Sequence, residues 1–229
     1  MILIPARDEA HSIAQVITES RRLYQVPIVV IDDGSQDDTA AIAAAAGALV
    51  LRLPLPLGAW GAMQTGLRYA CRQGWDLAIT LDADGQHDPA DIQDLIAPLL
   101  AGEADVVIGA CPLRVSRARR IAWRYFRGLT GIALEDLTSG FRAYNRAAVD
   151  RLIRPDATLL DYQDVGVLLI LRRQGLRIRE VPVTMRDRYD GKSHIFNSWW
   201  TVASYMVKTS LLSLAGVGGK RNRACLDED

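Results

Sequence analysis

Short apolar runs alternate with amphipathic stretches along the first half of the chain. The runs lie at residues 2–4, 28–31, 48–53, 77–81 and 105–108. Their length and their Val, Ile and Leu content are typical of buried strands in a parallel sheet. Helical patterns fill the intervals, at residues 10–24, 38–46, 61–73 and 89–100. The alternation predicts an α/β fold in which a mostly parallel sheet is sandwiched by helices.

Acidic loops follow three of these predicted strands. Asp8 and Glu9 come after the first, Asp32 and Asp33 after the second, and the pair Asp82 and Asp84 after the fourth. The carboxyl ends of parallel strands meet at one edge of a sheet, which is where α/β folds bind their ligands.

The pair Asp82 and Asp84 is the most informative of these features. Alternation along a strand predicts that both carboxylates point the same way. Two like charges held together need a counter-ion, and a hard divalent cation carried by phosphates supplies it. The loop therefore predicts a site for a metal ion and a diphosphate. The stretch from Asp33 to Ser35, taken alone, is equally typical of the N-terminal cap of a helix.

Composition excludes several other classes of protein. The 229 residues include 27 basic and 27 acidic ones, so no overall field attracts nucleic acid. The three cysteines, Cys71, Cys111 and Cys225, have neither metal-site spacing nor an even count. We expect a reducing, cytoplasmic setting, and no leader pattern precedes the first strand.

Six motifs in chain order resemble the family 2 glycosyltransferases of the GT-A fold, in particular the dolichol-phosphate mannosyltransferase and polyprenyl-phosphate glycosyltransferase branch. The motifs are Ile4-Pro5-Ala6-Arg7-Asp8-Glu9, Val30-Ile31-Asp32-Asp33-Gly34-Ser35, the small-residue helix with Gly61 and Gly66, Leu81-Asp82-Ala83-Asp84-Gly85-Gln86, Asp136-Leu137-Thr138-Ser139-Gly140-Phe141-Arg142, and Glu180-Val181-Pro182-Val183 with Arg188 and Ser193. The resemblance implies a Rossmann-like GT-A catalytic domain over residues 1–195, with a mixed, mostly parallel sheet.

The resemblance also implies roles for individual residues. The nucleotide-sugar donor would be bound by Pro5, Ala6, Arg7, Glu9, Asp33, Gly34, Ser35, Gly61, Asp82 and Ala83, with Asp33 contacting the base or ribose. Mg²⁺ or Mn²⁺ would be held by Asp82, Asp84 and Gln86. The residues implied in catalysis are Asp84, Asp136 and Arg142. The implied reaction is a metal-assisted, inverting transfer of one sugar from a nucleoside diphosphate.

The acceptor is predicted from an unusual run of arginines. Six of them fall between residues 114 and 127 without one acid. A lipid phosphate is already an anion and needs only cations to position it, whereas a hydroxyl needs a general base. We therefore expect a polyprenyl phosphate bound by Arg117, Ser139, Arg142, Arg188 and Ser193. The alternatives are a solvated arginine face, and a hydroxyl acceptor with Asp136, Asp161 or Asp164 as the base.

The end of the sequence predicts a C-terminal amphipathic helical extension at residues 196–217, followed by a disordered tail at 218–229. Only Lys208 is charged between Trp199 and Val217. A helix lying in the interface of the inner face of the plasma membrane fits this pattern better than a spanning one. The alternative is a helix packed on the domain or on a second copy of the chain, in a homo-oligomer.

Two rivals come from other functional classes. Phosphohydrolases of the haloacid dehalogenase type also carry a D-x-D-G loop after a strand. Their loop usually lies near the N-terminus and continues with Thr or Ser, whereas Gln86 follows Gly85 in this chain. The other rival is a non-catalytic module that binds nucleotide sugars, against which the intact pair of Asp82 and Asp84 argues.

Overall fold

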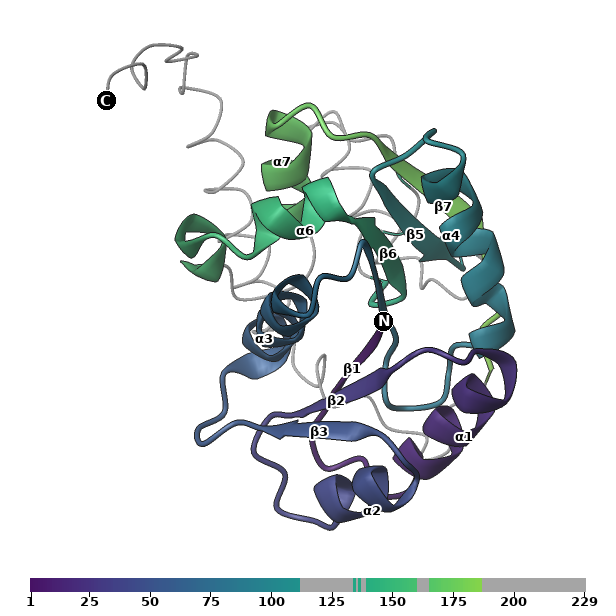
Figure 1. The fold of residues 1–229 in the computed structure, drawn as a ribbon, viewed down its shortest axis with the longest axis vertical. Helices are drawn as coiled ribbons and strands as arrows, with labels where there is room; N and C mark the ends of the chain where they lie inside the picture. Colours follow the sequence, from purple (N-terminus) through teal and green to yellow (C-terminus); the bar gives the residue numbers. More distant parts are fainter. Residues whose placement is uncertain (112–133, 135, 137–138, 160–164, 187–229) are drawn as a thin grey trace, which may run out of the picture.

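The protein is built on a seven-stranded sheet with helices on both faces (Figure 1). The computed structural model describes residues 1–111, 134, 136, 139–159 and 165–186. The strands are β1 (Ile2–Ala6), β2 (Ile28–Asp32), β3 (Leu49–Arg52), β4 (Leu77–Thr80), β5 (Val106–Ala110), β6 (Arg142–Asn145) and β7 (Ile178–Pro182). Their order across the sheet is β3-β2-β1-β4-β6-β5-β7.

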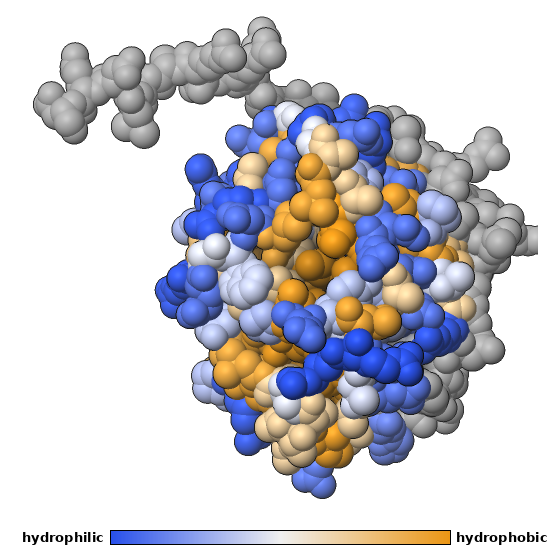
Figure 2. Space-filling model, turned by 45° about the vertical axis from the view of Figure 1, so that its right-hand side comes forward, coloured by the Kyte–Doolittle hydropathy of each residue, from blue (hydrophilic) through white to orange (hydrophobic). Residues whose placement is uncertain are grey.

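The helices cover the sheet in two groups. They are α1 (Ile13–Leu23), α2 (Thr39–Ala45), α3 (Gly58–Arg72), α4 (Ile92–Leu100), α6 (Arg146–Leu152) and α7 (Val165–Arg173), with the 3-10 helices η1 (Pro89–Asp91) and η3 (Pro155–Leu159). Apolar side chains of α3, α6 and α7 form one core with the sheet, and those of α1, α2 and α4 form the other. The side of the molecule on which α1 and α4 come forward is a mosaic of hydrophilic and hydrophobic residues (Figure 2).

Periodicity explains how α3 packs. Trp60, Met63 and Leu67 recur every three or four residues and are buried, so they form one apolar face toward the sheet. The indole N–H of Trp60 donates a hydrogen bond to the carbonyl of Ala157 at 2.6 Å. This bond ties the N-terminal half of α3 to η3.

The five predicted strands and four predicted helices are confirmed, with three differences. The first is that β3 is an edge strand, and Leu49 is 46% exposed, so the prediction of a fully buried strand was wrong there. The second is that β4 ends at Thr80, one residue before Leu81. The third is that η1 precedes α4, and Asp88 caps it by accepting a hydrogen bond from the amide of Ala90.

The sequence did not predict β6, which lies between β4 and β5 and runs antiparallel to both. The other pairs of neighbouring strands among β1 to β7 are parallel. The Thr80 hydroxyl donates to the Gly140 carbonyl at 2.6 Å and fixes the entry into β6. The sheet is thus mixed and mostly parallel, as the family resemblance implied, with a late strand inserted between β4 and β5.

No helix within the described ranges has the length and apolar character needed to cross a membrane. The predicted helix at 196–217 and the tail at 218–229 lie outside those ranges, as do the arginine run and Arg117, Asp161, Asp164, Arg188 and Ser193. The predictions that involve these residues stay predictions.

Candidate active site

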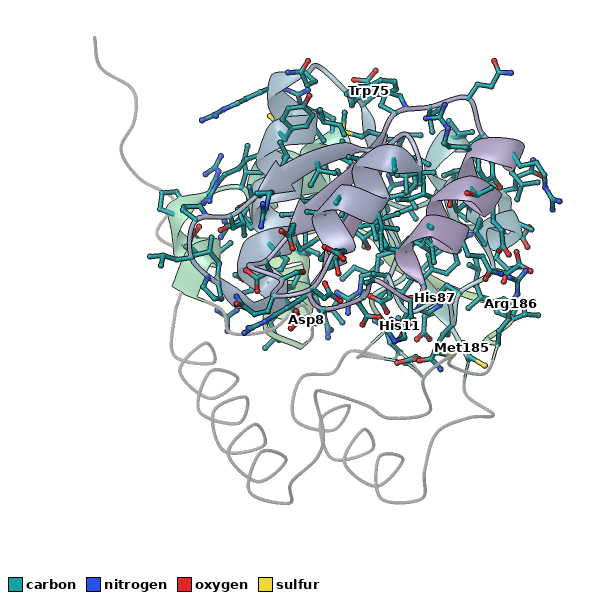
Figure 3. All side chains as sticks on the ribbon, turned by 90° about the horizontal axis from the view of Figure 1, so that it is seen from below. Asp8, His11, Trp75, His87, Met185 and Arg186 are labelled. Carbon is teal, nitrogen blue, oxygen red and sulfur yellow. The ribbon has the colours of Figure 1, made fainter. Side chains whose placement is uncertain are left out.

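One edge of the sheet gathers the chemically active loops. The carboxyl ends of β1, β2 and β4 meet there because these strands are parallel. The antiparallel β6 brings its beginning to the same edge. Viewed with side chains, Asp8, His87, Met185 and Arg186 lie along this edge, and Trp75 lies at the opposite one (Figure 3).

The loops after β1 and β2 are bound to each other by reciprocal hydrogen bonds. The amide of Asp8 donates to the Ser35 hydroxyl at 3.0 Å, and the Asp8 carboxylate accepts from the amide of Gln36 at 2.7 Å. Asp8 has a φ of 56°, a left-handed conformation that aspartate tolerates better than most residues. The predicted donor-binding residues of both loops therefore sit on one rigid unit.

Asp33 connects the second loop to α3. It is only 4% exposed, and its two oxygens accept hydrogen bonds from the amides of Leu57 at 2.6 Å and Gly58 at 2.9 Å. The negative charge also lies where the helix dipole of α3 is positive. Asp33 thus orients the start of α3 and Gly61 in its first turn, and its predicted contact with base or ribose stays a prediction.

Replacing Asp33 with asparagine is expected to lower the free energy of unfolding by about 2 kcal/mol, because the amide group can accept only one of the two backbone bonds. The concentration of donor needed for half-maximal rate should rise as α3 shifts. Denaturant unfolding and donor titration measure the two effects. Asp38→Asn is the matched control, since Asp38 precedes α2 and makes no side-chain capping bond. Equal effects in both variants would contradict this role of Asp33.

The loop that follows β4, residues 82–88, is called the metal loop from here on. In the antiparallel pairing of β4 with β6, Thr80 lies opposite Arg142. Extending this register by two residues places Asp82 opposite Gly140. A Cβ atom on Gly140 would lie 2.3 Å from Oδ1 of Asp82, so only glycine leaves room for this carboxylate. The prediction that strand alternation orients Asp82 and Asp84 was wrong, because β4 ends at Thr80, before either residue.

Hydrogen bonds give the metal loop its shape. Oδ1 of Asp84 accepts from the amide of Gln86 at 3.0 Å, and Gly85 adopts a φ of 75° in the turn between them. Oδ2 of Asp82 accepts from Nε2 of His87 at 3.1 Å. The two carboxylates are therefore held in place by partners within the loop itself.

His87 is a close neighbour of the two carboxylates, through its contact with Asp82. Its side chain is only 3% exposed, and its ring packs on Phe141 with 5.0 Å between the ring centroids. Burial lowers the pKa of His87, but the hydrogen bond to Asp82 and the charges of Asp82, Asp84 and Asp136 outweigh it and raise the pKa above its ordinary value. A cationic imidazole is thus favoured beside the pair of carboxylates.

The metal loop suits a divalent cation that arrives with a diphosphate. Among the described residues, no group of three or more His, Cys, Asp and Glu side chains forms a complete protein cage. Mg²⁺ is usually bound by one or two carboxylates together with substrate phosphates and waters. Asp82 and Asp84 supply hard oxygen ligands of that kind, and Gln86, half-buried on the same loop, carries a third oxygen.

The segment that leads into β6 forms the other wall of the site. The amide of Asp136 donates to the carboxylate of Glu180 in β7 at 2.6 Å, and Asp136 itself is buried. The Ser139 hydroxyl accepts from the amide of Phe141. Nε of Arg142 donates to the carbonyl of Ser139 at 2.8 Å, and Arg142 is completely buried. Direct contact of Arg142 with an acceptor therefore stays a prediction.

The sequence is matched over residues 1–156 by the family model described as Glycosyl transferase family 2. The chain belongs to this family and is a glycosyltransferase. Its resemblance to the family, stated from six motifs, is thereby confirmed.

Curated relatives of this glycosyltransferase align over most of its length. It is 26% identical to the polyprenol monophosphomannose synthase of Mycolicibacterium smegmatis, over 98% of this chain and 89% of the relative. It is 32% identical to the undecaprenyl-phosphate mannosyltransferase of Micrococcus luteus, over 84% of this chain and 86% of the relative.

A solved structure confirms the GT-A fold. The glucosyl-3-phosphoglycerate synthase of Mycobacterium tuberculosis, in complex with phosphoglyceric acid, superposes with a TM-score of 0.69 at 23% identity. The match covers 97% of this glycosyltransferase and 80% of the other chain. Another structure of that synthase contains Mn²⁺ and uridine diphosphate.

The site brings together most of the residues that the sequence predicted. Pro5 and Ala6 lie in β1, Ala83 is buried in the metal loop, and Glu9 accepts a hydrogen bond from the Ser12 hydroxyl. The side chain of Arg7 is half exposed at the edge. The sequence placed Gly140 and Glu180 in motifs without giving them a role, and it gave no role to Thr80. Their contacts depend on segments far apart in the sequence.

Proposed function

We propose that this glycosyltransferase moves one sugar from a nucleoside diphosphate donor to a polyprenyl phosphate, with inversion at the anomeric carbon. The observation that carries the proposal is the alignment with a polyprenol monophosphomannose synthase over 98% of the chain. The arginine run between residues 114 and 127 supports it, because guanidinium groups bind phosphate oxygens in pairs.

In this proposal the donor lies across the loops after β1, β2 and β4. Asp82, Asp84 and Gln86 would hold Mg²⁺ or Mn²⁺, and such a cation would offset the charge that develops on the departing nucleoside diphosphate. His87 holds the carboxylate of Asp82 in place. Asp33 and the loop of Asp8 and Ser35 keep the donor side of the site rigid.

The acceptor step follows from the charge of the nucleophile. A phosphate oxygen attacks the anomeric carbon from the face opposite the diphosphate, a new C–O bond forms, and the bond to the diphosphate breaks. No proton has to leave the acceptor, so no general base is required. We propose that Ser139 and Arg142, together with Arg117, Arg188 and Ser193, position the acceptor phosphate. A lipid acceptor also implies contact with the inner face of the plasma membrane.

A hydroxyl acceptor is the second candidate, and the position of Asp136 favours it. Asp136 is buried in the segment that leads into β6, and its charge contributes to the raised pKa of His87 in the metal loop. A carboxylate in such a place could accept the proton of an attacking hydroxyl.

The test is release of nucleoside diphosphate from a panel of donors with Mg²⁺ or Mn²⁺, with undecaprenyl phosphate, with undecaprenol, and without acceptor. Undecaprenol is the matched control because it has the same tail and a hydroxyl in place of the phosphate. We expect release from one donor to depend on undecaprenyl phosphate. Release that depends on undecaprenol or on a free sugar instead would overturn the lipid-phosphate acceptor and favour Asp136 as a base.

A further inference from the structure

A short segment after β7, residues 183–186, runs alongside the metal loop; we call it the strap. Its first amide, that of Val183, donates to the carbonyl of Ala110 at 3.0 Å. Met185 forms an antiparallel bridge with His87, and the amide of Arg186 donates to the carbonyl of Gln86 at 2.7 Å. The strap therefore runs beside the metal loop as a partner strand.

The side chain of Arg186 fastens the strap to two other elements. Its Nη1 atom lies 2.7 Å from Oε2 of Glu19 in α1, and its Nη2 atom lies 2.7 Å from Oδ2 of Asp88 at the end of the metal loop. A planar guanidinium can bind two carboxylates at once, which a lysine ammonium does with poorer geometry. Figure 3 shows Arg186 beside Met185 at the edge that carries His87.

The strap is coupled to Asp82 through His87. The backbone of His87 pairs with Met185, while its imidazole donates to the carboxylate of Asp82. The His87 ring is buried against Phe141, and this packing restricts its rotation about the side-chain bonds. A displacement of the strap is therefore transmitted to the orientation of Asp82.

We propose that Arg186 is a positioning residue: it clamps the strap to the metal loop and thereby keeps Asp82 oriented toward the cation on the donor diphosphate. The part that concerns the cation rests on the proposed function. The clamp itself rests on the contacts of Arg186 with Glu19, Asp88 and Gln86. Both ion pairs are partly exposed, and the loss of such pairs changes an equilibrium by about fivefold.

Amide hydrogen exchange tests the clamp without any ligand. In Arg186→Gln, the amides of residues 82–91 and 183–186 are expected to exchange about fivefold faster than in the unchanged protein. Residues 177–182, which contain β7, should exchange at the same rate in both proteins. The matched control is Arg179→Gln. Arg179 is an exposed arginine of β7 with its own ion pair to Glu103, away from the metal loop. Exchange in Arg186→Gln that equals exchange in Arg179→Gln would overturn the inference.

The Mn²⁺ requirement tests the effect on the site. We expect the Mn²⁺ concentration that gives a half-maximal rate of nucleoside diphosphate release to rise about fivefold in Arg186→Gln and less in Arg186→Lys, with no change in Arg179→Gln. A stable variant with faster exchange but an unaltered Mn²⁺ requirement would overturn the positioning role. Failure of undecaprenyl phosphate to act as acceptor would contradict the proposed function instead, and it would leave this comparison of Mn²⁺ requirements intact.

Discussion

Asp84→Asn is expected to lower the rate of sugar transfer about a thousandfold, with little change in stability. Asparagine has nearly the same shape, and its carbonyl oxygen can still accept the hydrogen bond from the amide of Gln86 that shapes the metal loop. The change therefore removes one negative charge from the cation site and leaves the turn intact. Lewis-acid assistance to a leaving group contributes several kcal/mol, and about 4 kcal/mol corresponds to three orders of magnitude in rate.

The measurement is the initial rate of nucleoside diphosphate release at saturating Mn²⁺, together with thermal unfolding. Asp94→Asn is the control, because Asp94 is an exposed carboxylate on α4 and its removal changes the net charge equally. An Asp84→Asn enzyme with full metal-dependent activity would show that the metal loop has been assigned wrongly.

Gly140→Ala is expected to lower the transfer rate about a hundredfold. The new methyl group would lie 2.3 Å from Oδ1 and 2.8 Å from Oδ2 of Asp82, so the carboxylate has to move. A misplacement of about 1 Å at a reacting centre can cost about two orders of magnitude in rate. The Mn²⁺ concentration that gives a half-maximal rate should rise in this variant, because Asp82 is a predicted metal ligand.

Gly66→Ala separates this effect from general crowding. Gly66 lies in α3, and an added methyl group there would press on the apolar side chains of Ile31 and Leu3. We expect Gly66→Ala to alter the unfolding temperature with its Mn²⁺ requirement unchanged. If both variants lose activity in proportion to their stability, the close approach of Gly140 to Asp82 has no special importance.

Local sequence signals were sufficient for the N-terminal half of the fold. Each predicted strand there is a predominantly apolar run, and the capping by Asp88 ahead of Pro89 can be read from neighbouring residues. Strand β6 had no such signal, because its sequence is Arg142-Ala143-Tyr144-Asn145. It becomes a strand through its pairing with β4 and β5, and tertiary context of this kind overrides local preference.

The candidate site shows the same division. Acidic residues at the ends of strands were visible in the sequence, and they do meet at one edge. The reason that Asp82 is oriented was not visible, since it depends on Gly140, which is 58 positions away, and on the bridge from Met185 to His87. Asp33 was predicted to contact the base or ribose, with a cap for the following helix as the alternative, and its hydrogen bonds to the amides at the start of α3 were not foreseen.

The insertion of β6 between β4 and β5 has a consequence for synthesis of the protein. When residues 1–111 have left the ribosome, the segments of β4 and β5 have been synthesised. Strand β6, which pairs with both of them, has not. Each then exposes an unpaired edge, the kind of surface that invites wrong association. Only after Asn145 emerges can β6 join β4 to β5 and bring Gly140 to Asp82. The candidate site is thus assembled late, and chains that terminate before β6 lack both the strand that links β4 to β5 and the contact between Gly140 and Asp82.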